Sequence, residues 1–158
     1  MEKVTLCPMT RELCHALYRN WQNDPAVYAD PAVCAPYHYD AAQVDQYYDA
    51  KQEPDRIFLA ILLEDRVIGE IHLKRIDREK GECALGIHLQ SDAVKEKGYG
   101  TRAEKLALRY AFDTLGLRAV EADALIGNTR SQHVLEKAGF TRVGEDERFR
   151  DYRCEEQK

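Results

Sequence analysis

The sequence lacks the long apolar run that a membrane span requires. Nothing in its 158 residues approaches about 20 consecutive apolar positions, and the N-terminus, with Glu2 and Lys3, lacks the apolar run of a secretory signal. The five cysteines have no metal-ligand spacing and form no Cys-x-x-Cys pair. An odd number of cysteines without a signal peptide is typical of reduced thiols. These absences predict a cytoplasmic protein with no membrane partner and no metal.

An excess of positive charge is missing as well. The chain has 23 Lys and Arg against 28 Asp and Glu, which gives a net charge of −5. Proteins that bind nucleic acid normally carry a basic face, so this balance argues against such a partner. It is compatible with a cationic acceptor such as an amine, although mild acidity also serves solubility. The length suits one domain over residues 1–158.

Apolar periodicity predicts the order β-α-α-β-β-β-α-β-α-β, followed by a charged tail. The expected strands are 4–7, 56–63, 66–76, 82–89, 118–125 and 141–148. The expected helices follow the caps Thr10 and Asp40, run from about 101 to 115, and follow the turn 127–131. Three strands joined by tight turns form an antiparallel meander, whereas a helix between 82–89 and 118–125 makes those two strands parallel. The fold class is therefore α+β with a mixed sheet.

Two glycines after the strand 82–89 carry the strongest functional signal. Gly98 and Gly100 have no Cβ, so the backbone there can approach a ligand closely. The helix that follows offers unpaired N–H groups and the positive end of its dipole. Such a terminus receives phosphate groups, and Lys95 and Lys97 add positive charge beside it. The pattern predicts a cradle for a pyrophosphate.

The same glycines also match a dinucleotide-binding fingerprint, Gly98-x-Gly100-x-x-Ala103. A Rossmann glycine turn follows its strand almost at once, but eight residues separate Leu89 from Gly98 here. The 33 residues after Leu125 are also too few to complete a doubly wound sheet. A Walker loop is excluded because Gly-Lys-Ser/Thr is absent. A nucleotide-dependent oxidoreductase is therefore disfavoured.

A second motif follows the strand 118–125. The segments 95–101 and 128–140, with Asn128-Thr129-Arg130-Ser131 and Leu135-Glu136-Lys137-Ala138-Gly139-Phe140, together resemble the GNAT (Gcn5-related) N-acetyltransferase superfamily. The resemblance is closest to its ribosomal-protein N-acetyltransferase-like branch, and the segment 21–27 also looks like that branch. It covers about residues 3–144 and implies a single GNAT domain. Its mixed sheet would have six to seven strands, with strands 4 and 5 parallel and splayed, flanked by about four helices.

The resemblance also implies how acetyl-CoA would bind as co-substrate, with no metal. Backbone N–H groups of the glycine loop would hold the pyrophosphate, and the strand before it would pair with the pantetheine arm. The implied contacts are Ile87, His88, Leu89, Lys95, Glu96, Lys97, Gly98, Tyr99, Gly100, Thr101, Asn128 and Ser131. Lys95 departs from the Gln or Arg usual in the family. The alternative role for Asn128 is a plain helix N-cap.

In this family the amine attacks the thioester directly within a ternary complex. Leu135 stands where many members have a tyrosine general acid. Ser131 matches a serine that the ribosomal-protein branch is thought to use instead, and its alternative role is that of a surface serine in the first turn of a helix. The candidate general bases are Glu70, His72, Glu82 and His88, which project from one predicted face of the sheet. The predicted catalytic residues are Ser131, Asn128, Glu70 and His72.

The predicted activity is acetyl transfer to a primary amine, either a protein N-terminal α-amine or a small amine. The alternative is a catalytically inactive acyl-CoA-binding module. The proline-rich loop 22–39 is either functional or a packed connector. The charged tail 145–158 is expected to form one strand or a stunted hairpin around 152–154. Such a tail would leave one wall of the acceptor pocket open or completed by a second subunit of a homodimer.

Overall fold

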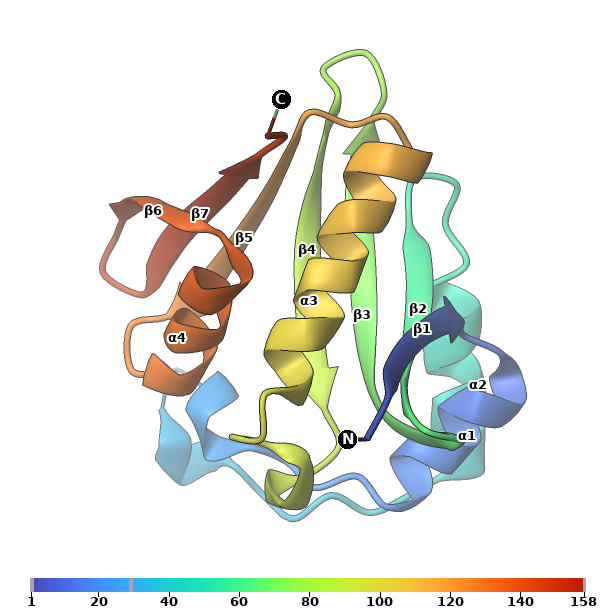
Figure 1. The fold of residues 1–158 in the computed structure, drawn as a ribbon. Coiled ribbons are helices and arrows are strands. Elements are labelled where there is room, and N and C mark those ends of the chain that lie inside the picture. The colour runs from blue at the N-terminus through green and yellow to red at the C-terminus, as the bar shows by residue number, and fades with distance from the viewer. Residues whose placement is uncertain (1, 29, 158) are drawn as a thin grey trace.

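The computed structural model describes residues 2–28 and 30–157, which form a mixed sheet with helices on both faces (Figure 1). The strands are β1 (Val4–Pro8), β2 (Ile57–Leu63), β3 (Arg66–Asp77), β4 (Glu82–Leu89), β5 (Ala119–Leu125), β6 (Thr141–Glu145) and β7 (Phe149–Glu155). Their order across the sheet is β1-β2-β3-β4-β5-β7-β6. Only the pair β4–β5 is parallel among the pairs of this sheet. The predicted α+β class with a mixed sheet of six to seven strands is confirmed, and the sheet has seven strands.

Four α-helices were predicted and are present among the described residues. They are α1 (Arg11–Arg19), α2 (Ala41–Ala50), α3 (Tyr99–Arg109) and α4 (Thr129–Ala138). Shorter turns are η1 (Pro25–Val27), η2 (Pro31–Val33), η3 (Asp92–Val94) and the π-helical η4 (Tyr110–Thr114), which continues α3. The helix expected from residue 101 begins two residues earlier, because Gly98 takes a left-handed conformation with φ 82° and acts as the N-cap of α3.

The alternating side chains of the strands build two separate cores. Leu59 and Ile61 of β2 point to the face covered by α3 and α4, which lies toward the viewer in Figure 1. Phe58 and Ala60 point to the opposite face, where they pack with residues of α1 and α2. The two faces of the sheet are therefore covered by different helices. A cleft between two strands of the sheet would have α3 and α4 on one side and α1 and α2 on the other.

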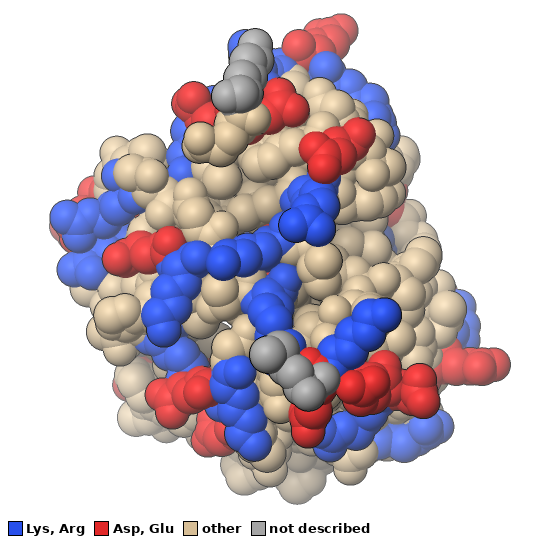
Figure 2. Space-filling view, viewed as in Figure 1, with Lys and Arg blue, Asp and Glu red and all other residues tan. Residues whose placement is uncertain are grey.

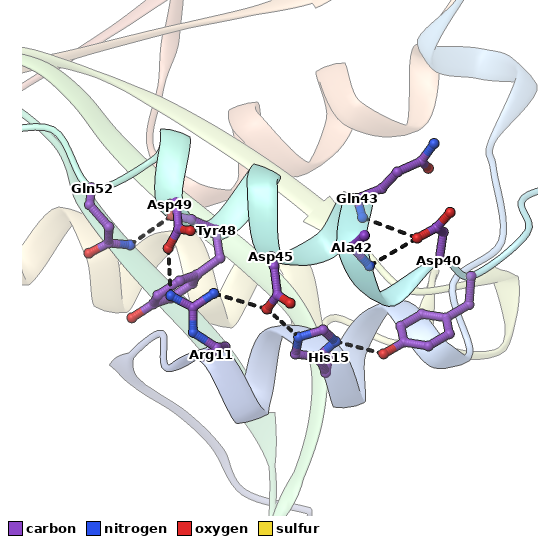
Figure 3. A network of polar contacts seen from close by, with 10 residues as sticks. Arg11, His15, Asp40, Ala42, Gln43, Asp45, Tyr48, Asp49 and Gln52 are labelled. Atoms are coloured by element: carbon purple, nitrogen blue, oxygen red, sulfur yellow. Dashed lines mark hydrogen bonds and ion pairs between the residues drawn. The ribbon is translucent and has the colours of Figure 1, made fainter.

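Polar contacts fix α1 against α2 on the second face (Figure 3). Arg11 donates to Asp45 Oδ1 at 2.9 Å and to Asp49 Oδ1 at 2.5 Å. His15 Nε2 lies 2.8 Å from the same Asp45 oxygen. The predicted caps are confirmed: the side chain of Thr10 accepts from a backbone N–H of α1, and that of Asp40 from two N–H groups of α2. Exposed ion pairs contribute about 0–1 kcal/mol each, so their main effect is on orientation.

The two parallel strands separate soon after they meet. β4 and β5 pair at three positions, and the last of these joins Ala84 to Glu121. Beyond that point β4 stays paired with β3 as far as Leu89, and β5 stays paired with β7 as far as Leu125. Each strand thus keeps its outer partner while the two facing edges diverge. The predicted splay is present.

The charged tail 145–158 contributes one strand, β7, which includes residues 152–154 as expected and forms a hairpin with β6. Asp146 Oδ1 accepts the N–H groups of Arg148 and Phe149 at 2.8 Å each, which turns the chain between β6 and β7. β7 then pairs with β5 over all seven of its residues. Arg153 on β7 donates to Glu82 and Glu121 at 2.8 Å each. The positive charge of Arg153 in the tail is therefore paired with negative charges on β4 and β5.

Within the part of the chain that the structure describes, no helix has the length and apolar character needed to cross a bilayer. The same residues contain no group of three or more His, Cys, Asp or Glu side chains placed to hold a metal ion.

Candidate active site

A cleft opens where β4 and β5 part. One side is formed by Ile87, His88 and Leu89 at the end of β4. The start of α3 and the start of α4 complete it, together with the segment between α1 and η1. The cleft thus gathers three parts of the chain that are far apart in sequence. Of the residues that sequence analysis assigned to acetyl-CoA, those that line it are Ile87, His88, Leu89, Lys95, Gly100, Asn128 and Ser131.

The glycine loop borders the cleft at the N-terminus of α3. A Cβ on Gly100 would lie 3.5 Å from Val134 Cγ1 and 3.7 Å from Leu89 Cδ1, so it would occupy space in the cleft wall. Gly98 is in the left-handed region, which a side chain would strain. Because the first N–H groups of an α-helix have no intrahelical partner, this terminus suits a phosphate group. The loop fits the predicted pyrophosphate cradle.

The charged side chains of the loop are largely engaged with protein. Lys95 Nζ lies 2.8 Å from Asp24 Oδ2, and the Lys95 side chain is only 8% exposed. Burial tends to raise the pKa of Asp24, but the hydrogen bond from Lys95 and the backbone bond from Ala26 outweigh it, and the pKa is lowered. Glu96 Oε1 lies 3.4 Å from Arg130 Nε. The side chain of Lys95 therefore ties the loop to the segment before η1 and is not presented to a phosphate.

The side chains of the other predicted residues of the loop lie outside the cleft. Tyr99 is buried, and its hydroxyl donates to Glu2 Oε2 at 2.7 Å, on the β1 side of α3. Lys97 is exposed, and Thr101 is half-buried in the first turn of α3. None of these three side chains lines the cleft. Lys and Arg side chains form a band across the middle of the face that carries α3 (Figure 2), so anions approach a locally positive surface despite the net charge of −5.

The start of α4 brings two polar groups to the cleft. Asn128 is the N-cap of α4, and its Oδ1 accepts the N–H of Ser131 at 3.2 Å. The capping role that was left open for Asn128 is therefore real, and its side-chain NH₂ has no acceptor among residues 2–28 and 30–157. Ser131 lines the cleft, whereas Leu135, 2% exposed, is packed in the core. The position usual for the tyrosine acid thus holds a core residue.

The candidate bases on β3 are buried beneath two tyrosines. Glu70 is 0% exposed and accepts hydrogen bonds from the Tyr47 hydroxyl at 2.5 Å, from the Tyr18 hydroxyl and from His72 Nε2. Arg56 Nη1 lies 2.9 Å from His72 Nδ1, so Nδ1 accepts from Arg56 and Nε2 is the nitrogen that donates to Glu70. Burial tends to raise the pKa of Glu70, but the bonds from His72 and the tyrosines lower it. Glu70 is therefore an ionised carboxylate, and neither it nor His72 lines the cleft.

His88 is the histidine of this group that does line the cleft. It is the register partner of Glu70, so the two share a sheet face as predicted. Its side chain reaches solvent inside the cleft, yet the surrounding protein desolvates the ring and lowers its pKa. A neutral imidazole can accept a proton. Glu82, the fourth member of the predicted face, lies at the far end of β4 with Arg153.

Sequence reasoning missed several cleft residues. Trp21 lines the cleft and stacks on Tyr18 with 4.6 Å between ring centroids, and the N–H of Gln22 donates to the carbonyl of Gln90 at 2.9 Å. These contacts join the end of α1 to the end of β4, and no local pattern indicates them. Glu104 on α3 was also missed. Glu104 lies one helical turn after Gly100 and one turn before buried residues of α3. This spacing could have predicted that its side chain faces inward.

A sheet that opens between its two parallel strands, beside a helix capped by glycine, defines the fold of an acyl-CoA-dependent N-acyltransferase. Residues 3–141 match the Acetyltransferase (GNAT) domain family. The chain belongs to this family, and the predicted superfamily is confirmed.

Two relatives and one solved structure illustrate the similarity. The chain is 32% identical over 104 residues to Probable N-acetyltransferase YjcK of Bacillus subtilis (strain 168), a match that covers 65% of this chain and 58% of YjcK, less than two thirds of that protein. It is 28% identical over 155 residues to Uncharacterized N-acetyltransferase p20 of Bacillus licheniformis, covering 96% and 84% of the two chains. Spermidine N-acetyltransferase from Vibrio cholerae, in complex with CoA and spermine, superposes with a TM-score of 0.77 at 16% identity, covering 96% and 95%. That likeness concerns the fold.

Proposed function

We propose that the protein transfers an acetyl group from acetyl-CoA to a primary amine. The observation that carries the proposal is the cleft between β4 and β5. It combines a glycine-capped helix terminus, a strand edge without a neighbour, and the polar residues Asn128 and Ser131. Family membership supports the same activity.

Acetyl-CoA fits the cleft in three parts. The N–H groups at the start of α3 meet the pyrophosphate, where the absence of a Cβ at Gly100 leaves room. The β4 edge from Ile87 to Leu89 has lost its β5 partner and can pair with the amides of the pantetheine arm. The NH₂ of Asn128 is available to the arm from the α4 side, since capping uses only its oxygen.

The chemistry needs a neutral amine, a stabilised oxyanion and a proton for the leaving thiolate. The amine nitrogen bonds to the thioester carbon, and the carbon–sulfur bond breaks as the tetrahedral intermediate collapses. A backbone N–H of the β4 segment 87–89 would stabilise the oxyanion. The amine releases one proton and the thiolate takes one, so the overall proton count balances. Ser131 is the hydroxyl of α4 that lines the cleft, which supports it as the donor to the thiolate.

His88 is the better base candidate than Glu70 or His72. It reaches the cleft, and its lowered pKa keeps the imidazole neutral at pH 7. Glu70 and His72 are enclosed by Tyr18 and Tyr47 and act as support behind it. A neutral histidine suits an acceptor that is already partly deprotonated. This favours a protein N-terminal α-amine, with an ordinary pKa of about 7.7–8.0, or a small amine of similar pKa over a lysine side chain near 10.4.

The test is thiol release from acetyl-CoA with a panel of peptides, polyamines and aminoglycosides. In an active protein we expect Ser131→Ala and His88→Gln each to reduce kcat by about 10²-fold or more. Thr129→Ala and His133→Gln are matched controls, because both residues are exposed on α4 outside the cleft. Unchanged kcat in Ser131→Ala would remove serine as the acid, and unchanged kcat in His88→Gln would remove histidine as the base.

A catalytically inactive acyl-CoA-binding module is the second candidate. It is favoured by Leu135, which packs in the core where the family usually has a tyrosine acid. Tight binding of acetyl-CoA without turnover of any amine in the panel would support it. A homodimer stays a proposal, and it is supported by β6, which lies at the sheet edge with all five residues exposed, including Val143 at 61%. The expectation that a second subunit completes an open wall loses its basis, because β7 pairs with β5 along its whole length.

A further inference from the structure

Glu104 is buried in the α3 wall of the cleft without a polar partner. It is 0% exposed, and neither carboxyl oxygen has a hydrogen-bond partner among residues 2–28 and 30–157. The residue nevertheless belongs to the lining of the cleft, one helical turn beyond Gly100. Buried polar groups are almost always hydrogen-bonded, so an orphan in a ligand cleft points to a ligand that completes it.

The surroundings of Glu104 supply no counter-charge. Next to it in the cleft, the space beside Gly100 is bordered by the apolar side chains of Leu89 and Val134. Burial alone raises the pKa of Glu104 to about 8. The carboxyl group is therefore protonated at neutral pH, with one O–H donor and one carbonyl acceptor.

The other ionisable groups of the cleft are committed elsewhere. Lys95 from the glycine loop pairs with Asp24 from the segment before η1 at 2.8 Å. Arg130 from α4 lies 3.4 Å from Glu96, and the pKa of His88 on β4 is lowered by desolvation. None of these groups is a hydrogen-bond partner of Glu104.

We propose that the Glu104 carboxyl group hydrogen-bonds an amide of the pantetheine arm of acetyl-CoA. The inference rests on the proposed function, since it places the arm in the opening beyond the last β4–β5 pair. The arm carries two amides and a hydroxyl, so it offers both donors and acceptors, whereas the cleft near Gly100 is bordered by the apolar side chains of Leu89 from β4 and Val134 from α4. A carboxylic acid can donate to an amide carbonyl and accept from an amide N–H, which makes Glu104 the polar complement of the arm on the α3 wall.

The experiment is calorimetric titration of the intact protein with two ligands. Acetyl-CoA contains the arm, whereas adenosine 3′,5′-bisphosphate contains the nucleotide without it. We expect Glu104→Leu to raise the Kd of acetyl-CoA about tenfold, because an amide of the bound arm loses its partner. The bisphosphate should bind both proteins equally. Glu104→Gln keeps a donor and an acceptor, so its affinity for acetyl-CoA at pH 7 should stay within about threefold of the unmodified protein.

A pH series supplies a readout that a purely structural role would not move. As pH rises through about 8, Glu104 ionises and loses its donor, so the affinity of the unmodified protein for acetyl-CoA should fall. The ratio of the affinity of Glu104→Gln to that of the unmodified protein should therefore rise over the same range. Asp24, His88, Lys95 and Arg130 are present in both proteins, so their contributions cancel in this ratio.

The negative results of these titrations can be told apart. If the unmodified protein binds acetyl-CoA and Glu104→Leu binds it equally well, Glu104 does not contact the arm and this inference alone is overturned. Equal weakening of both ligands would also overturn it, because the effect would then lie outside the arm. If the folded, unmodified protein binds no acetyl-CoA, the proposed function fails and takes this inference with it.

Discussion

Replacing Glu104 with glutamine should change how the stability of the protein depends on pH. The folded pKa of Glu104 is about 8, against an ordinary value of 4.5, because burial disfavours the charged form. The folded protein therefore holds a proton that the unfolded chain releases above pH 4.5. The stability associated with this proton is fully present below pH 4.5 and is lost as pH rises toward 8.

The expected magnitude follows from the width of that window. One pH unit is worth about 1.4 kcal/mol, so between pH 5 and 7.5 the unmodified protein should lose about 3 kcal/mol relative to Glu104→Gln. Comparing the two proteins cancels the other titrating groups. Urea unfolding can be followed by the fluorescence of Trp21, the single tryptophan, which stacks on Tyr18. A difference that stays constant within about 0.5 kcal/mol over this range would refute the burial argument.

Two further predictions concern β3. Tyr47→Phe removes a donor 2.5 Å from Glu70 and should cost about 1.5–3 kcal/mol at pH 7. Because the pKa of Glu70 is lowered below 4.5, this cost is fully present above pH 4.5 and is lost as pH falls through the lowered pKa; a cost by urea unfolding that stays constant from pH 7 down to the pH at which the protein unfolds in acid would contradict it. Gly69→Ala places a Cβ 2.7 Å from the backbone oxygen of His88 and should cost about 1–3 kcal/mol, with weaker acetyl-CoA binding. Its control, Gly144→Ala, meets nothing nearer than 4.0 Å, and a similar loss in both variants would argue against the clash.

The elements and their order could be predicted because each depends on local periodicity and local caps. Thr10 and Asp40 cap α1 and α2 as expected, and the helix expected to end near residue 115 is followed by Gly116, which takes a left-handed conformation with φ 70°. The position of β7 in the sheet, between β5 and β6, could not be predicted in the same way. It depends on pairing with β5 and on Arg153 bridging two glutamates, which are contacts between distant segments.

In the candidate site, too, the features that depend on local sequence could be predicted and the contacts between distant segments could not. The glycine loop and the start of α4 were found because they are short motifs with backbone chemistry of their own. The partners of individual side chains were not, because they arise only in the fold: Lys95 meets Asp24, and Glu70 meets tyrosines from α1 and α2. Glu104 was missed because a charged residue within a helix is usually solvated.

Calorimetric titration with acetyl-CoA tests whether the cleft between β4 and β5 receives this co-substrate, and it requires no knowledge of the acceptor. NAD⁺ is the control ligand, since the glycine loop also matches a dinucleotide fingerprint. We predict binding of acetyl-CoA with a Kd on the order of micromolar and none of NAD⁺. A folded sample that binds neither ligand, or that binds NAD⁺ alone, would show that the cleft does not receive acetyl-CoA.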